Sequence, residues 1–299
     1  MQANGPRILV TGATGFLGRA LCTYFSLNNY RVQGLSRRSA PDPNTIPDVQ
    51  FYRGDLPGYI DSAAFEEVDV VIHCAYATQH AKRDEAHEIN YNGTALVQSM
   101  SRNAGVEKFV FISSIAAHIS AEAFYGSSKF KIEQTMDRKR DLIIRPGLII
   151  SHGGTFGQMV NNLARLRVMP LFQQGQQIIQ TVYIDDLCMA IEKAIRKQLT
   201  GIQVIAEPVG IDMKSFFRRI SKQLNISCVF IPLPFTPILS IIKFLERHKL
   251  TPPLTSENLL GLKHMRMVAS EESLNRLGIT LRTYKESIQL FSDQWQSMY

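Results

Sequence analysis

Short runs of apolar residues alternate along the chain with stretches in which apolar positions recur at helical spacing. This order predicts an α/β fold with a doubly wound parallel sheet. Helices are expected to begin near Phe16, near Glu85, at Phe124 and near Ile184. The Pro-rich stretch 41–47 is expected to form a surface loop. The predicted strands are Arg7 to Thr11, Arg31 to Ser36, Val49 to Arg53, Val68 to Cys74, Lys108 to Ser113, Leu142 to Arg145 and Ile202 to Ala206.

The first apolar run leads directly into the segment Thr11-Gly12-Ala13-Thr14-Gly15-Phe16-Leu17-Gly18. A strand, a glycine turn and a helix in this order place unpaired backbone N–H groups and the positive end of the helix against a pyrophosphate. We assign Gly12 to the sharp turn, Gly15 to the close approach of a phosphate and Gly18 to tight packing of the helix on its strand. The alternative is a glycine-rich turn that holds no ligand.

A second segment, Tyr125-Gly126-Ser127-Ser128-Lys129, places a phenol and an ammonium group one helical turn apart. Free tyrosine has a pKa of about 10, so only roughly one phenol in a thousand is ionised at neutral pH. A lysine four residues further along a helix favours the phenolate. Beside a nicotinamide cofactor, the pair predicts an acid/base unit that exchanges a proton with a substrate hydroxyl or ketone. The alternative for Tyr125 is a half-buried structural tyrosine.

The glycine spacing and the Tyr-x-x-x-Lys segment together resemble the short-chain dehydrogenase/reductase superfamily, in particular its extended, epimerase/dehydratase-like branch. The resemblance covers roughly residues 7 to 195 and implies a Rossmann-type fold that binds NADP or NAD. It implies catalytic roles for Ser114, Tyr125 and Lys129, with Ser113 as the alternative to Ser114. The cofactor-binding residues expected in full are Gly12, Thr14, Gly15, Phe16, Leu17, Gly18, Ser36, Arg37, Arg38, Asp55, Leu56, Cys74, Ala75, Tyr76, Tyr125, Lys129 and Pro146.

The second predicted strand ends in Ser36-Arg37-Arg38, where an NAD-selective protein usually places a carboxylate against the ribose 2′-hydroxyl. Guanidinium groups at this point favour the 2′-phosphate of NADP, with Arg37 as the first choice and Arg38 as the alternate. The alternative is that both arginines are solvated loop residues and that NAD also binds.

Composition narrows the class of protein. A chain of 299 residues with 45% hydrophobic content can bury a large core. Four scattered cysteines without a C-x-x-C pair favour a reducing compartment, and no charged and apolar leader precedes the first strand, so we expect a cytoplasmic protein. The net charge is +7, but the sequence has no basic stripe with interleaved aromatic residues, which argues against binding of nucleic acid. No histidine stands at metal-ligand spacing, so no metal is expected.

A smaller, mainly C-terminal lobe is expected to bind the substrate. We assign residues 1–145 plus about 180–206 to a dinucleotide-binding domain, and residues 146–179 plus about 207–299 to this lobe. The stretches Gly153 to Gln158 and Pro170 to Gln180 are polar and contain glycine, so they are expected to be binding loops. Arg165, Arg167 and Lys263 are candidates for clamping a diphosphate, although ordinary surface charge is the favoured interpretation.

Residues 226–242 carry no charge, but three prolines and the short length argue against a membrane-spanning helix. An apolar lid over the substrate is the simpler interpretation. Because Lys243, Arg247, His248 and Lys249 follow, residues 226–249 are also compatible with contact to a membrane surface and a lipid-like substrate.

The predicted function is an NADP-preferring oxidoreductase or epimerase that acts on a carbinol or ketone of a nucleotide-linked sugar. Only eleven residues separate Ser114 from Tyr125, a shorter loop than is typical of the sugar-nucleotide epimerases. One alternative is a reductase or dehydrogenase of a hydrophobic alcohol or ketone, of the sterol- or flavonol-reductase kind. Another is a non-catalytic NADP-binding protein. A homodimer is expected only by analogy with the superfamily.

Overall fold

The structure is a computed structural model that describes residues 5–37, 46, 48–77, 83–248, 250, 254–263 and 265–298. The chain divides into two compact units, which we describe separately. Unit 1 comprises Met1–Ser113, Ser128–Arg145 and Leu187–Gln203, and unit 2 comprises Ser114–Ser127, Pro146–Asp186 and Val204–Tyr299. Residues 114–127 therefore group with unit 2, whereas the domain assignment from the sequence places them with the dinucleotide-binding part; the roles assigned to the two parts stay a prediction.

An eight-stranded sheet forms the centre of unit 1, with the order β12-β7-β6-β5-β1-β2-β3-β4. The central strand β1 pairs in parallel with both β2 and β5, so the chain order reverses there. In sheets of this kind ligands bind outside the carboxyl ends of the strands at the reversal point. The strands are β1 (Ile8–Thr11), β2 (Val32–Ser36), β3 (Val49–Asp55), β4 (Tyr59–Ile60), β5 (Val70–His73), β6 (Lys108–Ile112), β7 (Leu142–Pro146) and β12 (Gly201–Ile205).

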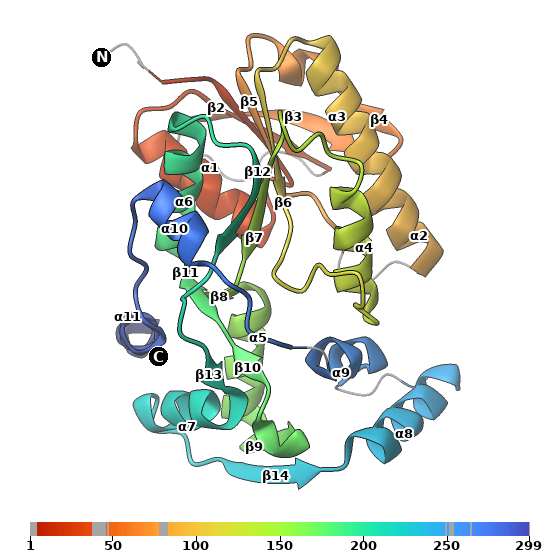
Figure 1. Cartoon of the computed structure of the whole chain (residues 1–299), viewed down its shortest axis with the longest axis vertical. Coiled ribbons are helices and arrows are strands. Elements are labelled where there is room, and N and C mark those ends of the chain that lie inside the picture. Colours follow the sequence, from red (N-terminus) through yellow and green to blue (C-terminus); the bar gives the residue numbers. More distant parts are fainter. Residues whose placement is uncertain are drawn as a thin grey trace. The chain divides into compact units, whose positions relative to one another are not determined.

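Helices cover both faces of this sheet. Figure 1 shows α1 (Phe16–Leu27) and α6 (Ile184–Arg196) on one face, and α3 (Gly93–Asn103) and α4 (Phe124–Glu133) on the other. The short α2 (Arg83–His87) continues through a π-helical turn, η2 (Glu88–Asn92), into α3, and a 3-10 turn, η1 (Ser62–Phe65), precedes β5. The doubly wound α/β fold is confirmed. The predicted strands agree with the observed ones to within two residues at each end, while the Pro-rich stretch 41–47 lies outside the described residues except for Ile46.

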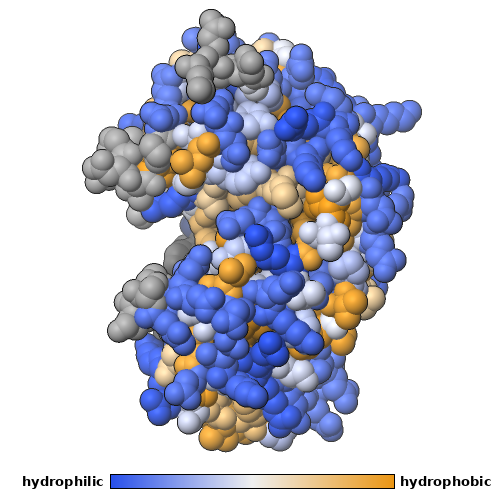
Figure 2. Space-filling view, turned by 90° about the vertical axis from the view of Figure 1, so that its left-hand side faces the viewer, coloured by the Kyte–Doolittle hydropathy of each residue, from blue (hydrophilic) through white to orange (hydrophobic). Residues whose placement is uncertain are grey.

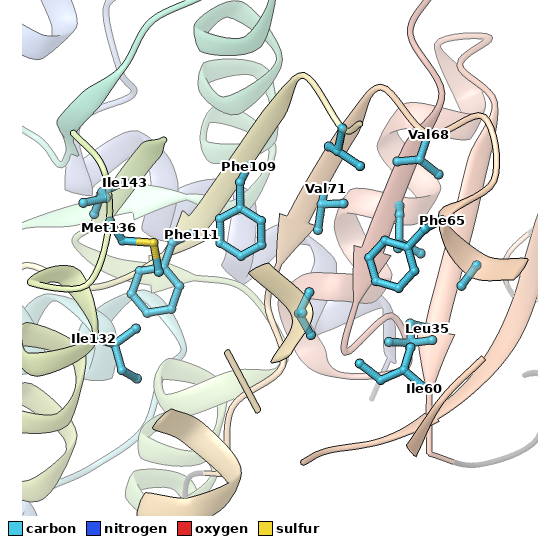
Figure 3. Packing of buried hydrophobic residues seen from close by; sticks show 14 residues of the cluster. Leu35, Ile60, Phe65, Val68, Val71, Phe109, Phe111, Ile132, Met136 and Ile143 are labelled. Atoms are coloured by element: carbon cyan, nitrogen blue, oxygen red, sulfur yellow. The ribbon is translucent and has the colours of Figure 1, made fainter. Parts of the chain in front are cut away.

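The core of unit 1 lies between the sheet and the α3 and α4 layer. Phe109 and Phe111 project from β6, with Phe109 toward Val71 of β5 and Phe111 beside Ile132 of α4 (Figure 3). Alternate positions of a strand face the same side, which is why the two phenylalanines meet one helix layer. Burying such side chains contributes roughly 1.5–3 kcal/mol each. After Lys108, the sequence of β6 is apolar because both of its faces are covered.

Unit 2 is built from small sheets and helices. Its two-stranded sheets pair β10 (Ile178–Ile179) with β13 (Ile211–Asp212), β11 (Thr181–Tyr183) with β8 (Leu148–Ile150), and β14 (Val229–Leu233) with β9 (Val168–Phe172). Phe156, Phe216 and Phe291, which are distant in sequence, are fully buried in one cluster. The remaining elements are α5 (Gly154–Leu166), η3 (Gln173–Gly175), α7 (Met213–Gln223), α8 (Phe235–Arg247), α9 (Ser256–Lys263), α10 (Glu271–Leu277) and α11 (Tyr284–Met298).

The prediction of two binding loops in the lobe is wrong over much of their length. Gly154 to Gln158 is the first part of α5, and Pro170 to Phe172 belongs to β9. Helix α5 forms because Phe156, Val160 and Leu163 repeat at helical spacing and all three are buried. Glycine at the start of a stretch is therefore compatible with a helix when an apolar stripe follows it.

The uncharged stretch 226–242 forms β14 and most of α8. Along the part of the chain that the structure describes, no helix is both long enough and apolar enough to cross a bilayer. The lid expected from this stretch stays a prediction.

Candidate functional site

The glycine turn after β1 has the geometry that its sequence predicts. Gly12 has φ +66°, in the left-handed region that favours glycine, and a Cβ there would lie 2.9 Å from the backbone nitrogen of Ala75. At Gly18 a Cβ would lie 2.2 Å from the carbonyl oxygen of Gly12, so α1 approaches the turn more closely than any other residue would allow. A Cβ on Gly15 would lie 3.1 Å from the same oxygen.

The amino end of α1 is open to an anion. Its N-cap is Gly15, which makes no side-chain cap hydrogen bond, and its first turn contains no acidic residue. The first backbone N–H groups of a helix have no partner within it and carry the positive end of its dipole. Thr14, Phe16 and Leu17, expected to bind cofactor, belong to this turn and are partly exposed. These features fit the pyrophosphate of a dinucleotide.

Two further strands of unit 1 end with residues that the sequence assigns to the cofactor. Ser36 is the buried last residue of β2, and Arg37 follows it with an exposed side chain, while Arg38 lies outside the described residues. Asp55 ends β3, is exposed, and lines a depression of about 450 Å³ together with Arg53, Gly58 and Tyr59. Leu56 instead packs against the core cluster. The Asp55 carboxylate is thus accessible, whereas the Leu56 side chain helps to hold the loop.

The loop after β5 is tied to the glycine turn. The backbone nitrogens of Cys74 and Ala75 donate to the carbonyl and the hydroxyl oxygens of Thr11, each at 3.3 Å. Asn90 closes the far side of the loop, because its amide accepts from the Ala77 nitrogen at 2.7 Å and donates to the Ala77 oxygen at 3.1 Å. Cys74, Ala75 and Tyr76 are therefore held partly exposed beside Gly12.

His73 is a structural residue of this loop. Its Nδ1 lies 2.7 Å from the Thr11 hydroxyl and its Nε2 lies 3.0 Å from the Thr94 hydroxyl. Burial lowers the pKa of His73 to about 3, with a further contribution from the charge of Lys129. The ring is therefore neutral at ordinary pH.

Lys129 lies in the buried part of α4. Its Nζ donates to the carbonyl oxygen of Ile112 at 2.6 Å, and it lies 4.0 Å from the ring centre of Tyr76 and 4.6 Å from that of Phe111. Desolvation lowers its pKa to about 7, although Cys74 and Glu133 act in the opposite direction. The ammonium group is thus stabilised by a carbonyl and two aromatic faces.

Sequence reasoning missed Glu133, which lies on α4 four residues beyond Lys129. Its fully buried carboxylate pairs with both the Nε and Nη2 of Arg145, at 2.8 Å for Nε, and accepts a hydrogen bond from Ser113. Through Glu133, the ends of β6 and β7 are linked to the helix that carries Lys129. In the sequence, the available signal was that each charged residue follows an isoleucine: Glu133 follows Ile132, and Arg145 follows Ile144. That the two charges pair is visible only in the tertiary structure.

Ser114 and Tyr125 meet in unit 2. The Ser114 side chain forms a hydrogen bond with the Tyr125 phenol and also accepts from the backbone nitrogen of Ala116 at 3.1 Å. Loss of solvation raises the pKa of Tyr125, while the bond from Ser114 lowers it. Tyr125 is 41% exposed, so its hydroxyl group belongs to a side chain that a substrate can reach. Ser113 points elsewhere, to Glu133.

Helix α4 carries Tyr125 and Lys129 four residues apart, as the spacing predicts. Its amino end is fixed where the Phe124 nitrogen donates to the Glu257 carboxylate, at 2.5 Å. Gly126 allows the helix to approach the preceding loop, because a Cβ there would lie 2.4 Å from the Ala116 oxygen. Pro146, also assigned to the cofactor, is the buried last residue of β7, and its carbonyl accepts from Ile115 at 3.1 Å.

Metal chemistry has no candidate in the described ranges, where no three His, Cys, Asp or Glu side chains gather in a way that could hold an ion. The four cysteines are free thiols, and burial raises the pKa of Cys22 to about 12. The expectation that the protein needs no metal stays a prediction.

The sequence is similar to those of known proteins. A ceramide reductase of Caulobacter vibrioides is 28% identical over 207 residues, which make up 67% of this chain and 64% of that protein. The chain therefore spans less than two thirds of that relative's length. A UDP-glucose 4-epimerase of Vibrio cholerae is 26% identical over 240 residues, 70% of this chain and 72% of that protein.

Among solved structures, a UDP-glucose 4-epimerase from Thermotoga maritima, in complex with UDP-glucose, has a TM-score of 0.75. The likeness covers 98% of this chain and 99% of that one at 16% identity, so it shows the fold alone. Residues 8–206, well over half of the chain and including the glycine turn, Ser114, Tyr125 and Lys129, match the NAD dependent epimerase/dehydratase family. The chain is therefore a member of that family of NAD(P)-dependent extended short-chain dehydrogenases/reductases.

Proposed function

We propose that the protein is an NADP-preferring oxidoreductase that interconverts a carbinol and a ketone, with Ser114, Tyr125 and Lys129 as its catalytic residues. The observation that carries the proposal is the hydrogen bond between Ser114 and Tyr125, on a tyrosine that is 41% exposed. A structural tyrosine has no need to combine a side chain that is 41% exposed with a hydrogen bond to a strand-end serine. The glycine turn and the open end of α1 support the binding of a dinucleotide in the same chain.

In this proposal, the residues hold the reacting oxygen and move its proton. Ser114 donates a hydrogen bond to the substrate oxygen, and Tyr125 takes the hydroxyl proton in oxidation or returns it in reduction. The bound nicotinamide supplies or accepts the hydride. Lys129, when charged, favours the Tyr125 phenolate from its place one turn along α4, and its ammonium group is a donor for a ribose hydroxyl.

Replacing Tyr125 with Phe removes the proton-transferring group and leaves the ring. We expect the turnover of an identified substrate to fall by about 10²-fold or more, while cofactor affinity changes little. A matched control is Tyr284→Phe, because Tyr284 is partly exposed, lies at the start of α11 and has no role in the proposed site. If Tyr125→Phe turns over substrate as fast as the unaltered protein, the acid/base assignment is wrong.

The preference for NADP is proposed from Arg37. It follows β2 directly and its side chain is exposed, without a carboxylate at the end of that strand. A guanidinium group at this point pairs with a 2′-phosphate. Affinities for NADPH and NADH, measured by fluorescence titration of the unaltered protein and of Arg37→Asp, test this. We expect the preference to shift by roughly tenfold or more toward NADH; an equal preference in both forms contradicts it.

For the substrate, we place a hydrophobic alcohol or ketone ahead of a nucleotide-linked sugar. Among the cations considered for a diphosphate clamp, Lys263 forms an ion pair with Glu122 at 2.7 Å, and Arg165 and Arg167 stand at the carboxyl end of α5. That end lies about 20 Å from the amino end of the same helix, which follows β8. A diphosphate clamp close to the carboxyl end of β8 therefore could not use Arg165 or Arg167.

Unit 2 offers apolar surface instead. A depression of about 320 Å³ lies where η3, β14 and α8 meet. Its lining combines two amide side chains with apolar walls, which suits an alkyl or ring system better than a diphosphate. The lining residues are Gln173, Gln174, Pro232, Leu233, Pro234 and Phe235. The ceramide reductase among the relatives supports this class, and the UDP-glucose 4-epimerase supports the sugar.

A turnover screen decides between these classes. Long-chain and polycyclic ketones and alcohols are tested beside UDP- and dTDP-sugars, each with NADP(H) and NAD(H), and each rate is compared with that of Tyr125→Phe. Tyr125-dependent turnover of an apolar substrate supports the first class. Turnover restricted to nucleotide sugars replaces it with the sugar class, and saturable NADPH binding without turnover in any arm favours a non-catalytic NADP-binding protein.

The wider assignments follow from the same proposal. Unit 1 is the dinucleotide-binding part and unit 2 supplies the substrate lobe. The partner is a small molecule and not nucleic acid, a homodimer remains the expectation by analogy, and the compartment is the cytoplasm.

A further inference from the structure

Unit 2 exposes an unusual amount of apolar side chain along two consecutive elements. On β14, Val229 is 61% exposed and Ile231 is 40% exposed; on α8, Ile241 is 54% and Phe244 is 62% exposed. Val168 of β9, which pairs with Val229, is exposed as well. We call these five residues the apolar face. Figure 2 shows apolar residues gathered at the lower end of the view, the level at which Figure 1 draws β14.

The apolar face is not the outer side of a poorly packed core. The opposite side of α8 places Phe235, Ile238 and Ile242 in a cluster with Phe172 and with Leu259 of α9. Phe230, the strand residue between the two exposed ones, packs into the main core of unit 2. Both elements therefore pack one side against unit 2, and each also exposes apolar side chains on the other. A helix or strand that needs only one buried side normally carries polar residues on the other.

Cations border the apolar face. Lys243 and Arg247 are exposed on α8 beside Ile241 and Phe244, and neither forms an ion pair with another described residue. Arg165 and Arg167 are exposed just before β9.

The one carboxylate of α8 is engaged elsewhere. Glu246 accepts from the backbone nitrogen of Ser256 at 2.8 Å and from its hydroxyl at 2.6 Å, at the start of α9. The border of the apolar face is thus positively charged without a competing exposed carboxylate on the same helix, in a chain whose net charge is +7.

We propose that the apolar face and the cations Lys243, Arg247, Arg165 and Arg167 form a docking surface for an anionic lipid bilayer. Apolar side chains enter the boundary between headgroups and acyl chains, and the flanking cations contact lipid phosphates. Charge complementarity selects an anionic lipid surface, because exposed cations flank the apolar face and α8 has no exposed carboxylate to oppose them. A fluid bilayer also needs no matching shape, unlike a protein partner. The inference goes beyond the proposed oxidoreductase activity and does not depend on it.

Co-sedimentation of the full chain with vesicles, without substrate or cofactor, tests this surface. The probes are vesicles of phosphatidylcholine alone and of phosphatidylcholine mixed with phosphatidylglycerol. We expect binding to the anionic vesicles, little to the neutral ones, and weaker binding as salt rises. Absence of binding to the anionic vesicles at low salt overturns the proposal.

Variants on each half of the surface sharpen the test. Ile241→Ser with Phe244→Ser should weaken binding by at least about tenfold, and removing each cation, as in Lys243→Gln or Arg247→Gln, should weaken it by about fivefold. The matched controls are Leu27→Ser, an apolar side chain that is 70% exposed on α1, and Lys139→Gln in unit 1, which should bind unchanged. If the controls lose as much affinity as the surface variants, the surface is not the one that binds.

A conservative variant guards against loss of folding. Phe244→Trp keeps an apolar ring at the centre of the apolar face, so it should bind like the unaltered protein and its added fluorescence should shift to the blue on anionic vesicles. An unshifted spectrum on vesicles that the protein does bind places the contact elsewhere and overturns the proposal.

A second copy of the chain is the competing occupant. If sedimentation velocity finds a dimer that Phe244→Ser dissociates, while vesicle binding is unaffected by the same change, the surface is a dimer interface and the proposal fails. Tyr125→Phe separates this test from the proposed function, since it should lose turnover but bind vesicles normally. If the unaltered protein binds vesicles but shows no turnover, the proposed function is wrong; if it shows turnover but does not bind vesicles, the docking surface is wrong.

Discussion

At the scale of single residues, the chemistry of this protein depends on how each buried charge is compensated. Lys129 and Glu133 lie four residues apart on α4, both almost completely buried. Glu133 is paired with a guanidinium, whereas Lys129 is held by a carbonyl oxygen and aromatic faces. Pairing a carboxylate offsets its desolvation, but a carbonyl dipole offsets that of an ammonium group only in part. The pKa of Lys129 is therefore lowered by its burial.

The shift makes folding stability depend on alkaline pH. The pKa of Lys129 is about 7 in the folded protein, against an ordinary value of 10.5. Between these values the unfolded chain holds a proton at Lys129 that the folded chain has released, so the free energy of unfolding rises as pH increases from about 7 to 10.5. Below that window, the cost of keeping the lysine charged is fully present.

Urea unfolding across this pH range measures the effect. We expect the stability of the unaltered protein relative to Lys129→Met to increase by a few kcal/mol from the lower to the upper end of the window. The control Lys131→Met, two positions along α4 and exposed, should show no such trend. A difference that is flat with pH contradicts the depressed pKa.

The buried carboxylate gives a second prediction at this scale. Glu133→Gln leaves the Arg145 guanidinium without its counter-charge, so the free energy of unfolding should fall by about 3 kcal/mol. Urea unfolding measures it, with the exposed Glu85→Gln as control. The double change Glu133→Gln with Arg145→Met should recover part of the loss, because no charge is then left unpaired. If Glu133→Gln is as stable as Glu85→Gln, the ion pair of Glu133 with Arg145 does not stabilise the fold.

At the scale of elements, the glycine turn joins β1, α1 and the loop after β5 into one unit. Three chain segments approach within van der Waals distance at Gly12 and Gly18, where a side chain would collide with backbone atoms. The sequence pattern was enough to predict this turn, because its glycines and its helix are adjacent in the chain. The close approach of Ala75, more than sixty residues away, was not available from the pattern.

Gly18→Ala tests the fit of α1 on the turn. The added Cβ would lie 2.2 Å from the Gly12 oxygen, so the amino end of α1 must move. We expect the affinity for NADPH to fall by about tenfold or more, since the first-turn N–H groups leave the position that suits a pyrophosphate. A fluorescence titration with NADPH measures this affinity. Gly261→Ala in α9, where the nearest atom is 3.9 Å away, is the matched control and should bind NADPH normally.

At the scale of the whole molecule, each unit closes its core with chain segments distant in sequence. Unit 2 begins its core with β8 and α5 and completes it with Ile288 and Phe291 of α11, near the end of the chain. Phe291 is fully buried and its ring lies 5.0 Å from that of Phe156 and 4.4 Å from that of His152. Because of these long-range contacts, the core of unit 2 is complete only when α11 has packed.

Phe291→Ala should therefore lower the free energy of unfolding by about 3–5 kcal/mol, because a cavity replaces a buried aromatic ring. The neighbouring Leu290→Ala is the control, since Leu290 is on the solvent side of the same helix and should change stability by less than about 1 kcal/mol. Thermal or urea unfolding followed by tryptophan fluorescence reports both, through Trp295 in the same cluster. Equal effects at the two positions would show that α11 does not complete the core.

The sequence by itself determined what depends on residues close together in the chain. The order of strands and helices, the glycine turn and the spacing of Tyr125 and Lys129 follow from periodicity and from the steric needs of glycine. The family resemblance already favoured Ser114 over Ser113, and the tertiary structure adds the physical difference between the two serines. Ser113 and Ser114 are neighbours of the same type, and Glu133 from a distant helix turn binds the first while Tyr125 takes the second. Only the tertiary structure decided that 154–158 is helical and that α8 also exposes apolar side chains, because burial depends on neighbours that no local pattern contains.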